Sequence, residues 1–316
     1  MTSLANAGVP AGATGRTPEE AYVRFRSALV EARLLVETGV DGLYVRSGAF
    51  EDVVAGIDRR VSAAATEASG RYYFPLVVPR RLLEQTGYLA SFPNLTGTVV
   101  SFEAGPAAHP AFVEAVEAGR EWADRLQVTD LALCSAGCHP LYPSLTGRLE
   151  SELQVEAFGQ IFRHEPSIDP ARMQAFRQHE VVYVGTADGA LAHRDRWVGR
   201  AGELLGSLGL VVEPVVANDP FFGRAGGLLA ASQRDEGLKI ELTATVASAE
   251  RPTAIASANC HRDHFGEAFS IALTDGTPAH SACVGFGVER IALALLSAHG
   301  LDTARWPADV REQLGL

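Results

Sequence analysis

Lysine is almost absent from this sequence. All of the 27 basic residues except Lys239 are arginine, and we attribute this bias mainly to genome composition. Because lysines on strands usually face water, we expect Lys239 to be a solvated strand residue. The alternative is that a single lysine in an arginine-only chain has a specific role.

Long hydrophobic runs are also absent, and cysteine is scarce. No stretch approaches the ~18 apolar residues that a membrane span needs. Residues 1–17 lack the basic and apolar regions of a signal peptide, so we expect a cytoplasmic protein with no membrane segment. In that compartment the four cysteines are expected to be reduced thiols or metal ligands rather than disulfides.

An excess of positive charge is missing as well. The chain has 38 acidic residues against 27 basic ones, a formal net charge of −11, which disfavours a general nucleic-acid binder. Its length of 316 residues and its 47% hydrophobic content describe a globular protein of one large or two ordinary domains. Either arrangement buries a core without disulfides.

Apolar periodicity predicts one α+β domain over residues 17–316, preceded by a mobile tail at residues 1–16. Thr17 and Pro18 are typical of a helix start. Helices are expected at 17–35, 49–67, 111–126, 189–208 and 287–299. Strands are expected at 42–46, 72–79, 96–102, 130–136, 159–165, 174–185, 210–217, 239–246, 253–259, 267–274 and 280–286. The short connections between the later strands favour an antiparallel sheet with helices packed on it.

The most informative stretch is FRHEPSIDPARMQAFRQHE, residues 162–180, in which a turn separates two strand-like segments. Arg163 and Arg172 offer guanidinium groups that can grip a phosphate, and Phe176 offers a face on which a base can stack. A charged, exposed hairpin is the simpler alternative. A second stretch, GFGVERIALALL at residues 285–296, joins a strand to an amphipathic helix whose first turn carries Arg290. Glycines there permit a ligand to approach the backbone closely, and the helix N-terminus favours anions.

Taken together and in this order, the two stretches resemble motifs 2 and 3 of class II aminoacyl-tRNA synthetases, whose core is an antiparallel sheet flanked by helices. The resemblance implies that Arg163 holds the α-phosphate and the amino-acid carboxylate, and that Arg290 binds the γ-phosphate of ATP. It implies further that Glu165 contacts the adenine amino group, that Phe176 stacks on adenine, and that Glu241 helps to hold Mg²⁺. The nucleotide contacts would therefore be Arg163, Glu165, Arg172, Phe176, Glu241 and Arg290.

Motif 1 of that family is a dimer-forming helix followed by a strand with a proline. The segment PRRLLEQTGYLASFPNL, which contains Pro93, is the match that we expect. Since class II enzymes generally need this dimer, the resemblance implies a homodimer.

A third constellation consists of Cys138, Glu180 and Cys283. Two thiolates and a carboxylate form a three-ligand zinc set that leaves a fourth position open, although free cysteines are more often small buried residues. Archaeal-type seryl-tRNA synthetases use Cys, Glu and Cys at corresponding places to bind the amino group of the substrate, so the resemblance implies Zn²⁺ here. Cys134 is the alternative to Cys138, and His139, His164 and His179 are nearby candidates that we expect to be structural.

The chain most closely resembles the truncated homologues of these enzymes, the amino acid:[carrier protein] ligases. The phrases YLASFPNLTG, HPLYP, NDPFFGRAG and NCHRDHFG carry this resemblance, and we expect no additional tRNA-binding domain. It implies that ATP activates glycine or alanine to an aminoacyl-adenylate. The aminoacyl group then passes to the phosphopantetheine thiol of a carrier protein, and tRNA is not expected to be a partner.

Three further expectations concern selectivity and docking. Asp219 is a candidate for contacting the substrate amine, with a turn residue as the alternative, and Cys260 is expected to line the pocket floor. The segment 191–202 carries Arg194, Arg196 and Arg200 beside Trp197; this helix is a candidate docking surface for an acidic carrier, although an ordinary solvated face is the simpler interpretation.

Two other functions stay open at this point. One is a stand-alone enzyme that aminoacylates a tRNA or another acceptor. The other is a catalytically silent homologue that binds ATP or an amino acid for regulation, which the intact set of nucleotide-contact residues disfavours.

Overall fold

A computed structural model of the protein describes residues 17–219 and 236–316. The expected tail at residues 1–16 and most of the NDPFFGRAG phrase lie outside the described residues. Helices are α1 (Pro18–Glu31), α2 (Gly48–Ala64), α3 (Arg80–Gln85), α4 (Tyr88–Ser91), α5 (His109–Glu117), α6 (Ala187–Ser207), α8 (His264–Ala268), α9 (Val288–His299) and α10 (Ala308–Leu314). Among the described residues, no helix is both long and apolar enough to cross a membrane.

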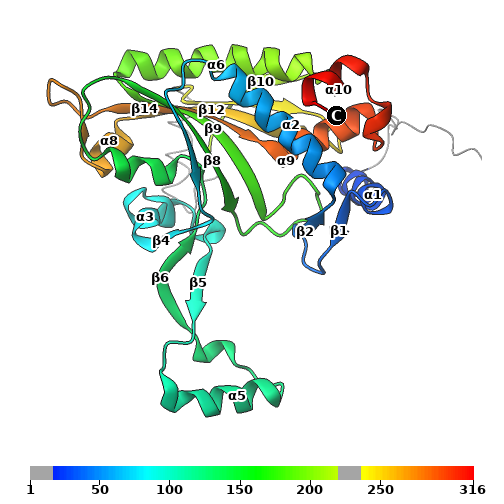
Figure 1. The fold of residues 1–316 in the computed structure, drawn as a ribbon, viewed down its shortest axis with the longest axis vertical. Helices are drawn as coiled ribbons and strands as arrows, with labels where there is room; N and C mark the ends of the chain where they lie inside the picture. The colour runs from blue at the N-terminus through cyan, green and yellow to red at the C-terminus, as the bar shows by residue number, and fades with distance from the viewer. Residues whose placement is uncertain (1–16, 220–235) are drawn as a thin grey trace, which may run out of the picture.

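A seven-stranded sheet forms the centre of the molecule, in the order β10, β11, β12, β14, β9, β8, β3 (Figure 1). Its strands are β3 (Arg71–Phe74), β8 (Leu153–Phe162), β9 (Ala175–Gly185), β10 (Glu213–Ala217), β11 (Lys239–Ala244), β12 (Thr253–Arg262) and β14 (His280–Gly287). Every neighbouring pair is antiparallel except β3 and β8, which run parallel. The expected antiparallel sheet flanked by helices is confirmed, with one parallel strand at its edge.

Helices α2, α6 and α9 cover one face of this sheet (Figure 1). On β14, Phe286 points to that face and meets Trp197 of α6, with ring centroids 6.2 Å apart. In α2, Phe50, Val54 and Ile57 recur at helical spacing and are buried, which explains why this segment is an amphipathic helix. The opposite face of the sheet is therefore the one left for a ligand.

A second, three-stranded sheet extends away from this body (Figure 1). It consists of β4 (Val77–Pro79), β6 (Gln127–Leu133) and β5 (Thr98–Ser101), and α5 lies beyond the end of β5 and β6. Two-residue strands β7 (Gly147–Arg148) and β13 (Ile271–Ala272) pair with each other, as do β1 (Leu35–Glu37) and β2 (Tyr44–Arg46).

Several expected boundaries are wrong for local reasons. The first helix ends at Glu31 rather than at residue 35, because Arg33 has a positive φ and the chain turns into β1. The expected helix at 111–126 ends at Glu117, next to Gly119 with φ +62°. The expected strand at 72–79 divides into β3 and β4, which belong to different sheets. The expected strand at 267–274 is instead the end of α8 and the short β13.

The segment expected to be motif 1 has a different structure. Residues 79–95 fold as α3, α4 and a single 3₁₀ turn at Pro93–Leu95, so they contain no long helix followed by a strand. The arrangement of a long helix, a strand and a proline occurs earlier in the chain, in α2, β3 and Pro75. The placement of motif 1 at residues 79–95 is therefore wrong, because this segment forms only short helices of six and four residues and a 3₁₀ turn.

An ion network centred on a partly buried arginine joins the sheet to its covering helices. Arg177 of β9 donates through Nε to Glu289 of α9 at 2.7 Å, and through both terminal nitrogens to Glu51 of α2 at 2.7 and 2.9 Å. Glu289 is only 1% exposed. Because removal of one partner would leave a buried charge unpaired, this network fixes the position of α9 relative to β9. Those two elements carry Arg290 and Phe176.

His193 of α6 packs against the face of the sheet that α6 covers. Because it is buried there, its titration makes the free energy of unfolding depend on pH. Burial lowers the pKa of His193 to about 4 from its usual 6.5, so the fold favours the neutral ring. Its Nε2–H donates to the Val181 carbonyl at 3.0 Å, and Nδ1 lies 3.0 Å from Gln154 Oε1. With its hydrogen on Nε2 the neutral ring leaves Nδ1 as an acceptor, so the Gln154 amide has to turn and present Nε2, which has no partner among the described residues, in place of Oε1.

We expect this contribution to be complete above about pH 6.5 and to disappear as the pH falls toward 4, because protonation is easier in the unfolded chain. The full change corresponds to about 3 kcal/mol. The free energy of unfolding, measured by urea titration between about pH 7.5 and about pH 4.5, checks this. The variant His193→Gln should show a shallower pH dependence than the unmodified protein. Equal slopes would contradict the assignment.

Candidate active site

A cavity of about 510 Å³ opens on the face of the sheet that α2, α6 and α9 leave uncovered. Strands β9, β14, β12 and β11 form its floor, and the segments around Thr86–Leu95 and Ala136–His139 line it from the side. Cavities of this size, with a few convergent charged groups, are typical of small-ligand sites.

Strand register places the polar residues of this floor in rows. Lys239 pairs with Asn259, which pairs with Cys283 on the next strand. Directly paired residues point to the same face of a sheet. In the adjacent row Glu241, Ser257, Gly285 and Glu180 follow one another across the four strands. Residues that are far apart in the sequence thus share one surface.

At one end of the cavity two arginines lie close to an aromatic ring. The guanidinium carbons of Arg163 and Arg290 are 5.8 and 5.6 Å from the ring centroid of Phe176. Burial, together with the nearby charge of Arg163, lowers the pKa of Arg290 to about 10, which still leaves it charged at neutral pH. Two cations this close repel each other, so an anion between them would be stabilised.

Hydrogen bonds fix these groups in place. Arg290 donates to the carbonyl oxygens of Ala171 and Ala254 at 2.9 and 3.0 Å. Arg163 donates through Nε to the Ser135 carbonyl at 3.2 Å. In both arginines the described residues leave other donor groups for a ligand.

The remaining motif 2 residues lie beside them. Arg172 and Glu165 form an ion pair at 3.0 Å at the border of the cavity, where Arg172 is 56% exposed. Glu165 lines the cavity itself, as do Phe176 and Glu241.

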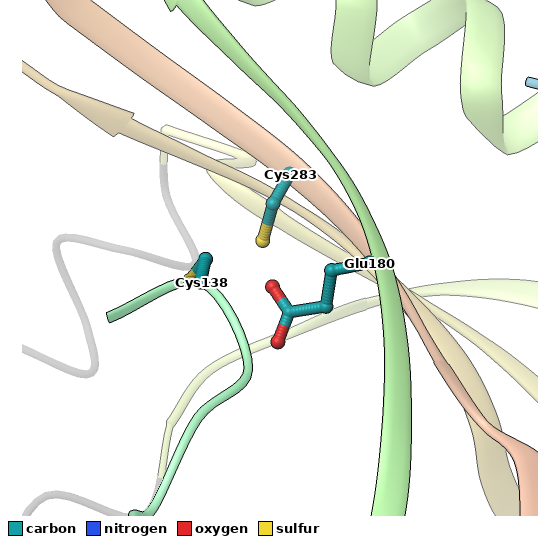
Figure 2. Close-up of side chains that lie close together, drawn as sticks. All are labelled: Cys138, Glu180 and Cys283. Atoms are coloured by element: carbon teal, nitrogen blue, oxygen red, sulfur yellow. The ribbon is translucent and has the colours of Figure 1, made fainter. Parts of the chain in front are cut away.

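Cys138, Glu180 and Cys283 all line the cavity, and their side chains lie close together (Figure 2). One ligand atom of each lies within 4.8 Å of the others, and all three residues are buried. Cys138 comes from the loop before a 3₁₀ turn, Glu180 from β9 and Cys283 from β14. This is the set that the sequence suggested as zinc ligands.

The donor set fits a zinc ion. Glu180 Oε1 accepts from the Gly137 amide at 2.9 Å, whereas its buried Oε2 has no hydrogen-bond partner among the described residues. The neighbouring Cys283 thiol and burial raise the pKa of Cys138, which favours the neutral thiol in the absence of a cation. A divalent cation bound between the three side chains would favour the thiolate instead. By contrast, the Cys134 thiol is directed at the Ala136 carbonyl, 3.2 Å away. Cys134 is therefore not one of the three convergent side chains.

Two glycines leave room for this carboxylate. A Cβ atom added to Gly137 would lie 3.0 Å from Glu180 Oε1, and one added to Gly285 would lie 3.4 Å from Glu180 Cγ. A larger residue at either position would press on the Glu180 side chain.

Sequence reasoning missed two residues next to this set. Asn259 Nδ2 lies 3.8 Å and His261 Nε2 lies 3.6 Å from Cys283 Sγ. The sequence of this strand could have indicated both residues, because period-two alternation places 259 and 261 on one face. Cys260 lies between them and packs with Tyr183 and Ala282 in a small apolar cluster, while it also borders the cavity.

The expectation for Lys239 is wrong. Its side chain is only 11% exposed, and its ammonium lies 2.5 Å from Asp219 and 3.2 Å from Glu241. All three residues line the cavity, so the only lysine of the chain belongs to the site. Lys239 begins the strand whose register brings it beside Asn259, and this position is not visible in local composition.

The arginines of α6 are only partly available for docking. Arg200 forms a bidentate ion pair with Glu67 at 2.6 and 2.8 Å, and its guanidinium lies 5.0 Å from the ring centroid of the buried Trp197. Arg194 bonds to Asp195 and to the Gly237 carbonyl. Arg196 is the member of the three that is exposed.

Comparison with known proteins decides the family. The chain is 42% identical over 286 residues to amino acid–[acyl-carrier-protein] ligase 2 of Bradyrhizobium diazoefficiens, covering 90% of this chain and 86% of that protein. Ligase 1 of the same organism is 39% identical, with 90% and 88% covered. The chain belongs to the amino acid–[acyl-carrier-protein] ligases. No family model matches this ligase sequence.

More distant relatives connect this ligase to the synthetases. Type-2 serine–tRNA ligase of Methanothermobacter thermautotrophicus is 24% identical over 259 residues, and the ligase spans 50% of it. Among solved structures, the seryl-tRNA synthetase of M. kandleri, crystallised with tRNASec of A. aeolicus, gives a TM-score of 0.76 at 21% identity. The match covers 95% of the ligase and 60% of that chain. The ligase therefore has the fold of class II aminoacyl-tRNA synthetases.

Proposed function

We propose that this protein uses ATP to activate a small amino acid and transfers it to the phosphopantetheine thiol of a carrier protein. One observation carries the proposal: a single cavity combines the two arginines at Phe176 with the buried set of two cysteines and a glutamate. The names of the relatives at 42% and 39% identity support the acceptor.

In the first step the amino-acid carboxylate attacks the α-phosphorus of ATP, and pyrophosphate leaves. No protein nucleophile is needed, so the chain contributes position and charge. Arg163 would hold the α-phosphate and the carboxylate, and Phe176 would stack on adenine. Arg290 would neutralise further phosphate charge from its buried position. Glu165 would contact the adenine amino group, and Arg172, which pairs with Glu165, would hold it there.

In the second step the carrier thiol attacks the aminoacyl carbonyl carbon. A carbon–sulfur bond forms, the bond from that carbon to the AMP oxygen breaks, and the thiol proton passes to solvent. The products are a thioester and AMP.

Cys138, Glu180 and Cys283 would hold Zn²⁺, and Glu241 would help to hold Mg²⁺. Zinc supplies an open coordination position that suits the amino group of a substrate. Asp219 would face this amine, with its carboxylate oriented by Lys239. Asn259 and His261 crowd the space beside Cys283, which favours glycine or alanine over larger amino acids.

We also propose that the protein is a homodimer, as class II enzymes generally are. The edge strand β3 supports this proposal, because Tyr72 and Tyr73 are 48% and 67% exposed there. An exposed edge strand with large side chains is typical of a surface that pairs with another chain.

A two-stage assay tests the function. We expect pyrophosphate exchange with glycine or alanine in zinc-loaded protein, and then thioester formation on a holo-carrier but not esterification of tRNA. Exchange with esterification of tRNA would support a synthetase-like enzyme instead. Absence of any amino-acid-dependent exchange would indicate a binding protein without catalysis.

A further inference from the structure

Arg262 ends strand β12 in an unusual backbone conformation. Its φ is +55°, a region that non-glycine residues seldom occupy. The register between β12 and β14 shifts between Cys260 and Arg262, so the strand contains a bulge at this point. Bulges beside active sites often re-aim a side chain.

The bulge changes what Arg262 can reach. In regular alternation residue 262 would share the face of Cys260, which packs into a cluster with Ala282. At the bulge the Arg262 side chain is instead 51% exposed, and Arg262 is one of the residues that line the cavity. The strained and bulged strand end thus places a guanidinium at the mouth of the cavity.

The strand register also shows how far Arg262 lies from the interior of the cavity. Asn259, which contacts Cys283 in the interior, and Arg262 pair with residues of β14 that are two positions apart, Cys283 and Ser281, so their Cα atoms are roughly 7 Å apart along the strand. Arg163 and Arg290 are situated at Phe176. Arg262 is thus a further cationic position, more exposed than Lys239 and distinct from the two arginines at Phe176.

Arg262 already has an anionic neighbour. It forms an ion pair with Glu236, whose side chain is 34% exposed. Ion pairs with this much solvent access are weak and exchange readily with a stronger anion. A phosphate group matches the planar guanidinium fork better than a single carboxylate oxygen does.

We propose that Arg262 binds the phosphate of the phosphopantetheine arm when the thiol enters the cavity. This inference rests on the proposed function and deepens it. The arm carries a phosphate at one end and a thiol at the other, and the cavity has a cation at its rim and the acyl-transfer site in its interior. Glu236 pairs with the Arg262 guanidinium until the phosphate takes the place of the Glu236 carboxylate.

The experiment compares acceptors with and without the phosphate. In zinc-loaded protein, KM and kcat are measured for holo-carrier, free phosphopantetheine and free pantetheine, alongside the KM for ATP in pyrophosphate exchange. We expect Arg262→Ala to raise the KM for holo-carrier and phosphopantetheine about tenfold or more, as for loss of one charge-assisted contact. The KM for pantetheine and for ATP should not change, and Arg262→Lys should recover part of the loss.

Arg305→Ala provides the matched control, because Arg305 is an exposed arginine that is also paired with a carboxylate, Asp302, and it lies outside the cavity lining. It should leave every KM unchanged. An Arg262→Ala variant with an increased KM for ATP would show a nucleotide contact and overturn the proposal, and so would an equal increase for pantetheine. If the unmodified protein exchanges pyrophosphate but transfers to none of the three acceptors, the acceptor part of the proposed function fails and this proposal fails with it.

Discussion

Replacement of Cys283 by serine is expected to remove bound zinc and to reduce amino-acid activation by at least about 10³-fold. The physical reason is that Cys283 supplies one of three converging ligand atoms, and two ligands hold zinc poorly. Zinc content by elemental mass spectrometry and pyrophosphate exchange are measured on the same samples. Both should fall together in Cys283→Ser and in Glu180→Ala.

Two features make this test specific. Cys134→Ser is the matched control, because a serine hydroxyl can keep the hydrogen bond to the Ala136 carbonyl and Cys134 is outside the ligand set. In Glu180→Ala the Gly137 amide retains an acceptor in Gln178 Oε1 at 3.0 Å, so the loop keeps its contact with β9. Full activity in Cys283→Ser without bound zinc would contradict the metal assignment.

Loss of the Arg163 guanidinium is expected to have the second largest effect. Arg163→Met should reduce kcat/KM for ATP in pyrophosphate exchange by about 10²–10³-fold, because charge develops on the α-phosphate in the transition state. Arg163→Lys retains the charge but loses the planar fork and the Nε bond to Ser135, so we expect little recovery.

The effect should be mainly on kcat, since the other contacts of ATP are retained. Circular dichroism and thermal unfolding establish that the variant is folded, and Arg196→Ala serves as a charge-matched control at the surface. A loss smaller than about threefold in Arg163→Met would show that Arg163 does not contact the reacting phosphate.

The sequence predicted the sheet and most of the proposed site residues that the structure brings together in the cavity, because both depend on alternation along strands. Arg163, Phe176 and Glu180 lie on or directly beside β8 and β9, the two long strands of a hairpin, where spacing alone indicates which side chains share a face. The family resemblance then supplied their chemistry. Helices α2 and α6 were also predictable, since each has an apolar stripe and a capping serine or threonine at its start, and α9 was predictable from its long apolar run.

What could not be predicted depends on contacts between distant segments. Whether Cys134 or Cys138 joins Glu180 is decided by the path of a loop without regular structure. Burial of Lys239 depends on Asp219, which approaches from the end of another strand. Motif 1 was misplaced because a proline is easy to see in a sequence, whereas the parallel pairing of β3 with β8 is not.

The row of paired strands beneath the cavity also has a consequence for the order of folding. Glu180 and Cys283 are about 100 residues apart, and β9 pairs directly with β14, so this pairing closes a long loop that contains α6, β10, β11 and β12. Contacts of such long sequence separation form late, because the entropy of loop closure must be overcome first. Zinc would thus meet its complete ligand set only in a nearly native chain, so it would slow unfolding more than it would accelerate folding.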